Sequence, residues 1–110
     1  MENCIFCKIV HKEIKTNIAY EDEKMLAFYD INPQAPFHLL LIPKKHITDI
    51  LSLEDKDIIG EIMLKIKELT KDISQSGFRI VINCGKDSGC EVFHLHIHIL
   101  GGRRLNWPPG

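Results

Sequence analysis

Three histidines alternate with apolar residues near the end of the chain, at residues 94–98. Successive side chains of a β-strand point to opposite faces, so His94, His96 and His98 are expected to share one face, roughly 6.5–7 Å apart. A neutral imidazole is a good nucleophile near neutral pH and needs no metal to activate it. In nucleotidyl transfer, one imidazole bonds to phosphorus while a neighbour donates a hydrogen bond to the oxyanion. The row therefore favours nucleophilic chemistry at phosphorus.

The same row has two other interpretations. Single histidines are often half-buried without a function, although strict alternation of three is an uncommon accident. Two histidines at positions i and i+2 of a strand also chelate zinc, but a third at i+4 lies too far away to join without a bend. The three histidines by themselves exclude neither of these two interpretations.

The segment before the histidines contains candidate phosphate-binding groups. Asn83 ends a strand-like run and offers an amide beside a leaving group. Gly89, Cys90, Glu91 and Val92 lead into the histidine row, and their backbone N–H groups are expected to form an anion-binding nest. An ordinary glycine-containing hairpin loop is the alternative.

These residues need a sheet to hold them, and the rest of the chain supplies its strands. Short runs of apolar and β-branched residues, separated by polar or proline-containing breaks, predict five strands. The predicted strands are residues 18–21, 25–30, 38–42, 78–83 and 93–100. A short helix is expected at residues 4–10 and a long one between the third and fourth strands. The order β-β-β-α-β-β with antiparallel hairpins predicts an α+β fold.

The long helix is predicted from its start signal and its apolar period. Ser52 and Asp55 match a capping box, and the helix is expected to stop before Gly77. Its apolar residues recur at helical spacing: Ile58, Ile59, Ile62, Met63, Ile66, Leu69 and Ile73. This helix is expected to cover the apolar face of the final strand and to leave the imidazoles on the opposite face.

Length and composition bound the class of protein. The chain has 110 residues, 45% of them apolar and 26% charged, which predicts a single domain over residues 1–110. Its net charge of −1 gives no electrostatic reason to expect nucleic acid or a membrane surface as a partner. The polar N-terminus and the short apolar runs predict no leader and no membrane span, hence a cytoplasmic protein small enough to enter a nucleus. The four cysteines are then expected to be reduced thiols or metal ligands.

The histidine row and several other stretches resemble one known family. The pattern His-φ-His-φ-His-φ-φ, where φ is apolar, is that of the histidine-triad (HIT) superfamily. Residues 43–46 (Pro-Lys-Lys-His) and 107–110 (Trp-Pro-Pro-Gly) are similar to its Hint branch, the histidine-triad nucleotide-binding proteins. Further similar stretches span nearly the whole chain: residues 5–6, 8–9, 27–28, 30–31, 33–36, 81–83 and 101–103.

The resemblance implies a fold, an assembly and an activity. The implied fold is a five-stranded antiparallel sheet with one long helix and a short N-terminal helix. Two copies would form a homodimer with a ten-stranded sheet, and the C-terminal segment with Trp107 would cross to the partner's site. The implied activity is hydrolysis of a purine nucleoside phosphoramidate through a nucleotidyl-histidine, releasing AMP or GMP and an amine. No cofactor is implied for catalysis.

The resemblance also assigns roles to individual residues. His96 corresponds to the nucleophile, and His98 to a donor toward the α-phosphate or the bridging atom. His94 would orient His96 through its backbone carbonyl, with His46 behind it as a further relay. Asp30 would bind the ribose hydroxyls, and apolar residues would enclose the base. The implied nucleotide-binding set is Phe6, Ile9, Phe28, Asp30, Ile31, His38, Asn83, Gly89, Glu91, Val92, His96, His98 and Trp107.

Cys4 and Cys7 form a Cys-x-x-Cys pair. Two thiolates at this spacing hold part of a zinc site, but a structural site needs four ligands. Some members of the resembled family carry this pair in a pattern that His46 and His94 would complete as Cys₂His₂. The expected metal is then a structural zinc, and two buried thiols without a metal are the alternative.

Two functions of other classes stay open. One is a nucleotide-binding scaffold or regulatory module with incidental hydrolysis. The other is a dinucleoside polyphosphate hydrolase of the Fhit branch, against which residues 101–103 and 107–110 argue. The sequence does not distinguish adenine from guanine. Glu91 replaces a serine found in many Hint proteins, so the role of its side chain is also open.

Overall fold

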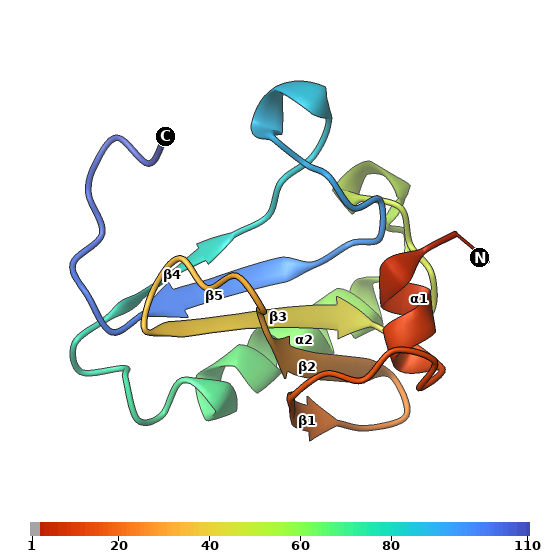
Figure 1. The fold of residues 1–110 in the computed structure, drawn as a ribbon, viewed down its shortest axis with the longest axis horizontal. Coiled ribbons are helices and arrows are strands. Elements are labelled where there is room, and N and C mark those ends of the chain that lie inside the picture. The colour runs from red at the N-terminus through yellow and green to blue at the C-terminus, as the bar shows by residue number, and fades with distance from the viewer. Residues whose placement is uncertain (1–2) are drawn as a thin grey trace.

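Within residues 3–110, which the computed structural model describes, the chain forms a five-stranded antiparallel sheet and two α-helices (Figure 1). The strands are β1 (Ile18–Glu21), β2 (Met25–Tyr29), β3 (Phe37–Pro43), β4 (Phe78–Val81) and β5 (Ile97–Gly101). The helices are α1 (Ile5–Val10) and α2 (Lys56–Leu69), with short 3-10 turns at Ile50–Ser52 and Lys86–Ser88. The strand order in the sheet is β1-β2-β3-β5-β4. The predicted α+β class and element order are confirmed.

Helix α2 covers one face of the sheet (Figure 1). Alternate residues of three strands point toward it and are apolar: Met25, Ala27, Leu39, Leu41, Ile97 and Ile99. From the helix, Ile58, Ile62 and Ile66 pack against them, at the i, i+4 spacing that places residues on one side of a helix. Complete burial of one such side chain stabilises a fold by about 1.5–3 kcal/mol. The long helix therefore packs where the sequence predicts, on the apolar side of the final strand.

The opposite face of the sheet carries a second apolar cluster. Strands β2 and β3 are apolar at successive positions, so both of their faces bury side chains. This second cluster consists of Phe6 and Ile9 from α1 with Leu26, Phe28, Leu40 and Ile42 from the sheet. The expectation that this face is left to the imidazoles is wrong where α1 packs. The histidines lie beside a small core and not on an open sheet.

The start of α2 differs from the prediction. Asp55 is the N-cap, and its carboxylate accepts hydrogen bonds from the N–H groups of Asp57 and Ile58. Ser52 lies in the preceding 3-10 turn, where its N–H and hydroxyl donate to the carboxylate of Asp49. The predicted capping box is therefore wrong, because each aspartate caps its own turn.

The end of α2 also comes earlier than predicted. The helix ends at Leu69, and irregular turns follow until Gly77, which has a φ of 96°. The hydroxyl of Thr70 donates to the carbonyl of Ile66 over 2.7 Å, a local bond that competes with continuation of the helical ladder. Among residues 3–110, no helix is long and apolar enough to cross a membrane.

Strand β5 begins at Ile97 and not at residue 93. It pairs with β3 in a register that sets Leu41 opposite Ile97 and would set Pro43 opposite Leu95. Proline has no N–H to donate, so the ladder ends there, and the N–H of Leu95 donates to the carbonyl of Ile47 over 2.6 Å. His98 alone of the histidine row lies in a strand, while His94 lies at a bend and His96 in the irregular segment before β5. Strand β4 likewise ends two residues before the predicted position.

Candidate active site

A cavity of about 530 Å³ opens between α1, the end of β2 and the segment before β5. This volume is within the usual range of small-molecule sites. Twelve of the thirteen residues implied to bind a nucleotide line it: Phe6, Ile9, Phe28, Asp30, Ile31, His38, Asn83, Gly89, Glu91, Val92, His96 and His98. The structure therefore brings together residues from four separate parts of the chain.

Trp107 is the one member of that set that does not reach the cavity. The residue is 81% exposed, and the C-terminal segment runs on the side of the molecule away from α1 (Figure 1). The guanidinium of Arg79 donates to the carbonyl of Asn106 over 3.0 Å and holds this segment beside β4. Within one chain, Trp107 therefore makes no part of the site.

The cavity also contains residues that sequence reasoning missed: Ile5, Ile14, Lys15, Thr16, Tyr29, Asn32, Gln34 and Leu40. Leu40 could have been found from the strand register, because it lies on β3 directly opposite His98. Lys15 and Thr16 belong to the loop between α1 and β1, where no local sequence signal marks their approach to the site.

His96 has a defined ring orientation. Its Nδ1 lies 2.7 Å from the carbonyl oxygen of His94, so Nδ1 carries the proton and donates. The ring of Phe6 packs edge-on against the imidazole at a centroid distance of 5.1 Å. His96 is 8% exposed, and it lines the cavity. In the neutral ring, the lone pair is therefore on Nε2, which has no hydrogen-bond partner among residues 3–110.

His98 lies beside His96 in the cavity, at a ring-centroid distance of 5.0 Å, shorter than the spacing expected from an ideal strand. Its Nδ1 is 2.9 Å from Nε2 of His38. Burial lowers the pKa of His98 to about 4, assisted by the neighbouring His96 and His38 and opposed by the charge of Asp30. The ring is therefore neutral near pH 7.

Asp30, His38 and His98 form a group that we name the carboxylate cluster; their possible ligand atoms all lie within 4.8 Å of one another. Oδ2 of Asp30 is 3.5 Å from Nε2 of His38, and its other oxygen accepts a hydrogen bond from the N–H of Asn32. The backbone N–H of Gln34 donates to Nδ1 of His38 over 3.0 Å. His38 thus belongs to a hydrogen-bond chain, a connection that the sequence did not indicate.

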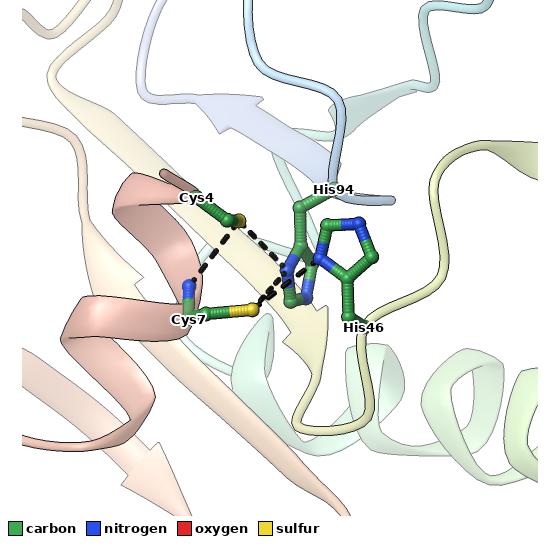
Figure 2. A group of neighbouring side chains, drawn as sticks. All are labelled: Cys4, Cys7, His46 and His94. Carbon is green, nitrogen blue, oxygen red and sulfur yellow. Dashed lines mark hydrogen bonds between the residues drawn. The ribbon is translucent and has the colours of Figure 1, made fainter. Parts of the chain in front are cut away.

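Cys4, Cys7, His46 and His94 form a second group, which we name the sulfur cluster (Figure 2). The cysteines come from the start of α1, His46 from the loop after β3, and His94 from the segment before β5 (Figure 2). Nδ1 of His94 lies 3.3 Å from Sγ of Cys4 and 3.6 Å from Sγ of Cys7. Nδ1 of His46 lies 3.3 Å from Sγ of Cys7. The four residues proposed as metal ligands are therefore adjacent.

Protonation in the sulfur cluster is constrained by its surroundings. Nε2 of His94 lies 2.8 Å from the carbonyl oxygen of Pro43, so Nε2–H donates and the lone pair of Nδ1 faces the sulfurs. Burial lowers the pKa of His94 and, together with the neighbouring Cys4, raises the pKa of Cys7. His46 packs against His94 at a centroid distance of 4.9 Å but does not line the cavity. Its position fits a role in this cluster better than the relay implied by the resemblance.

The loop before β5 supplies fewer amides than expected. Gly89 has a φ of 81°, which favours glycine, and its N–H donates to the carbonyl of Lys86 to close a 3-10 turn. This amide is not available to a ligand, so the predicted four-membered nest is wrong at its first member. Within residues 3–110, the N–H groups of Cys90, Glu91 and Val92 have no backbone partner. Those three amides remain at the cavity edge.

These features define a class: a small α+β domain that sets an oriented histidine in a cavity beside a Cys/His cluster. The model of the HIT domain family matches residues 11–105. The chain belongs to the HIT domain family, and the predicted membership in the HIT superfamily is confirmed.

Individual relatives are similar over nearly the whole chain. An uncharacterized HIT-like protein of Synechocystis sp. is 51% identical over 112 residues, which cover 99% of this chain and 98% of that protein. A 14 kDa zinc-binding protein of Zea mays is 49% identical, over 96% of this chain and 87% of that protein. The crystal structure of a HIT family hydrolase from Legionella pneumophila superposes with a TM-score of 0.95 at 46% identity, covering 98% of this chain and all of that one.

Proposed function

We propose that this protein hydrolyses purine nucleoside phosphoramidates of the Hint type, with His96 as the nucleophile. The observation that carries the proposal is the hydrogen bond from Nδ1 of His96 to the carbonyl of His94, 2.7 Å long. It leaves the Nε2 lone pair free in a cavity of ligand size. The similarity to a HIT family hydrolase from Legionella pneumophila supports hydrolytic chemistry.

The proposed reaction has two steps. Nε2 of His96 bonds to the α-phosphorus as the phosphorus–nitrogen bond breaks, and the amine departs with that electron pair and a proton from water. Water then attacks the nucleotidyl-His96, which releases the nucleoside monophosphate, restores the neutral imidazole and frees one proton, and that proton neutralises the hydroxide left by the first step. The Nδ1–H bond to the His94 carbonyl stabilises the positive ring that exists between the steps.

The cavity has parts that suit each portion of a nucleotide. Phe6, Ile9 and Phe28 give an apolar wall for the base. The carboxylate of Asp30 also lines the cavity and suits the ribose hydroxyls as a hydrogen-bond acceptor. Asn83 and the unpartnered amides of residues 90–92 suit the phosphate. With only its backbone turned to the phosphate, the exposed Glu91 would add no charge repulsion there.

The proposal is tested with His96→Gln, because glutamine cannot form the nucleotidyl intermediate. Turnover of a fluorogenic tryptamine phosphoramidate of adenosine should fall by roughly 10⁴-fold or more, while calorimetry should still detect AMP binding. The matched control is His11→Gln, which changes an exposed histidine outside the cavity and both clusters. Substantial turnover by the His96 variant would refute the nucleophile.

The same assay separates the other candidate functions. A faster rate with diadenosine triphosphate than with the phosphoramidate would favour the dinucleoside polyphosphate hydrolase. Tight AMP binding with negligible hydrolysis of both substrates by the wild-type protein would favour a nucleotide-binding scaffold. A parallel series with guanosine substrates decides the base preference.

A structural zinc is proposed for the sulfur cluster. Tetrahedral zinc with typical bond lengths sets neighbouring sulfur and nitrogen ligands about 3.5 Å apart. The three sulfur–nitrogen distances in the cluster, 3.3, 3.3 and 3.6 Å, fit this value. The Nδ1 lone pair of His94 faces the sulfurs, and its other nitrogen donates to the Pro43 carbonyl, as an outer hydrogen bond of a metal ligand does. When bound, zinc would supply a cross-link between α1 and the segment that carries His96, and catalysis would need no cofactor.

The protein is further proposed to act as a homodimer. Among residues 3–110, strand β4 is at the edge of the sheet and pairs with β5 alone, so two β4 edges would join two sheets into one of ten strands. Ile80 on this edge is 40% exposed, and Trp107 of the adjacent segment is 81% exposed. Light scattering should give twice the chain mass of 12.7 kDa. A monomer at micromolar concentration would contradict the dimer and the role of Trp107 in a partner's site.

A further inference from the structure

The carboxylate cluster contains hydrogen bonds of known direction. The backbone N–H of Gln34 donates to Nδ1 of His38 over 3.0 Å, and a peptide nitrogen cannot accept in return. The lone pair of His38 is therefore on Nδ1 and, in the neutral ring, the proton is on Nε2. His38 is only 4% exposed, and burial lowers its pKa against the opposing charge of Asp30. The ring is thus neutral with one assigned tautomer.

The tautomer of His38 determines that of His98. Nε2 of His38 lies 2.9 Å from Nδ1 of His98 and 3.5 Å from Oδ2 of Asp30. The first distance is typical of a hydrogen bond and the second is at the limit, so Nδ1 of His98 accepts the proton of His38. Because the pKa of His98 is about 4, its ring carries one proton near pH 7, on Nε2. Its second nitrogen is consequently a donor.

The same hydrogen bonds argue against a metal at this cluster. Two imidazoles and a carboxylate are a common ligand set for divalent cations. A metal on Nε2 of His38 would replace its proton while Nδ1 still accepts from Gln34, which would leave the ring as an anionic imidazolate. In the sulfur cluster the reverse holds, since His94 donates from Nε2 and keeps a lone pair on Nδ1. The hydrogen bonds of the carboxylate cluster fix which nitrogen of each imidazole carries the proton, and they leave no lone pair on Nε2 of His38 for a metal.

We propose that His38 is a positioning residue that locks His98 as a hydrogen-bond donor toward the reacting phosphate. The inference rests on the proposed function. As Nε2 of His96 bonds to phosphorus, negative charge develops on the phosphoryl oxygens and the departing nitrogen, and the fixed N–H of His98 stabilises it. Neither His38 nor His98 gives up its proton to the substrate, because loss of a proton from either neutral ring would create an imidazolate. His98 stabilises charge, and the amine takes its proton from water.

Nuclear magnetic resonance tests the tautomers directly. Long-range ¹H–¹⁵N correlation spectra of zinc-loaded protein with ¹⁵N-labelled histidines distinguish Nδ1–H from Nε2–H rings. His98 should carry its proton on Nε2 in the wild type. His98 should also carry its proton on Nε2 in the His38→Gln variant, because the amide N–H of the glutamine takes the place of the Nε2–H of His38. In His38→Leu, which offers no donor, Nδ1–H should appear. A wild-type His98 with its proton on Nδ1 overturns the proposal, and this measurement needs no variant.

Kinetics test the consequence for catalysis. His38→Leu should lower kcat by roughly tenfold to a hundredfold, less than the ~100- to 1,000-fold loss typical of deleting a direct oxyanion donor. KM should change less than about threefold, and His38→Gln should recover most of kcat. Unchanged kcat and an unchanged His98 tautomer in the leucine variant would overturn the proposal. Turnover by His96→Gln would instead refute the proposed function, and the tautomer result would stand apart from it.

Discussion

The sulfur cluster and the carboxylate cluster each contain two histidines, yet they present opposite chemical groups. In the sulfur cluster, a backbone carbonyl accepts the Nε2 proton of His94, and a lone pair faces the two thiols. In the carboxylate cluster, a backbone N–H occupies the Nδ1 lone pair of His38, and a proton faces His98. For His94 and His38, one backbone group therefore sets whether the imidazole turns a lone pair or a proton toward the rest of its cluster.

His96 lies between these clusters and depends on both. Its Nδ1 donates to the carbonyl of His94, whose side chain belongs to the sulfur cluster. Its ring packs beside His98, which belongs to the carboxylate cluster. The first contact orients the proposed nucleophile, and the second sets the proposed donor beside it. The carboxylate cluster lines the cavity, whereas the sulfur cluster joins α1 to the segment that carries His96.

The largest expected effect is the loss of zinc from the sulfur cluster. Cys7→Ala removes a buried ligand, so metal analysis should fall from one zinc per chain to none. The unfolding free energy should fall by roughly 4 kcal/mol or more, because metal binding contributes directly to folding. Cys84→Ser is the matched control, since Cys84 is a free cysteine outside the cluster. Full zinc content in the Cys7 variant would refute the ligand set.

The next effect comes from the other cluster and should leave the metal untouched. His98→Asn removes the proposed donor at the phosphate and should lower kcat by roughly 100- to 1,000-fold, about 2.7–4 kcal/mol of transition-state stabilisation. Zinc content and the affinity for zinc should equal those of the wild type. If His98→Asn released the metal, the two clusters would not be separate functional units. Steady-state kinetics and metal analysis on the same preparation give both answers.

A smaller effect concerns acid stability. Burial lowers the pKa of His98 in the folded protein to about 4, whereas its ordinary value is 6.5. Between these values the unfolded chain binds more protons, so folding stability should fall as pH drops from about 6.5 to about 4. Above pH 6.5 this contribution is fully present. His98→Gln should flatten that slope when denaturant midpoints are measured at saturating zinc, and equal slopes in both proteins would contradict the buried neutral imidazole.

Sequence reasoning located the histidine row and the element order because both are local patterns. Alternation over five residues predicted that His94, His96 and His98 share a face; His96 and His98 do line the cavity, whereas the His94 side chain lies in the sulfur cluster. The apolar period of α2 predicted which side of the sheet the helix covers. The Cys-x-x-Cys pair became informative only through the resemblance, since His46 and His94 lie far from it in the chain. The histidine row and the apolar face of α2 could be predicted because the side-chain period of a strand or a helix is the same in every protein.

The hydrogen bonds that set protonation could not be predicted in the same way. His38 meets His98 across sixty residues, and the tautomer of both rings depends on the backbone N–H of Gln34, which no side-chain pattern encodes. The early end of the β5 ladder depends on the pairing register that brings Pro43 opposite Leu95. The N–H of Gly89 donates to the carbonyl of Lys86 within a 3-10 turn, and the sequence does not show that this hydrogen bond forms.

The smallest expected effect on the fold comes from Asp30→Asn, and it tests how far the carboxylate differs from the thiols. Oδ2 of Asp30 lies 3.5 Å from Nε2 of His38, at the limit of a hydrogen bond, whereas each sulfur of the other cluster lies 3.3 Å from an imidazole nitrogen, well within the longer reach of sulfur. Near pH 7 both imidazoles of the carboxylate cluster are neutral, so loss of the charge should change the unfolding free energy by less than about 0.5 kcal/mol.

The same variant should weaken binding of AMP by roughly tenfold, the loss expected for about one hydrogen bond to a charged acceptor. It should weaken binding of the 2′,3′-dideoxy analogue far less, because that ligand has no ribose hydroxyl for Asp30 to accept from. Calorimetry with the two nucleotides on wild type and variant measures the difference. Equal losses for both would mean that Asp30 acts through His38 and His98, and the carboxylate would then be as central to its cluster as the thiols are to theirs.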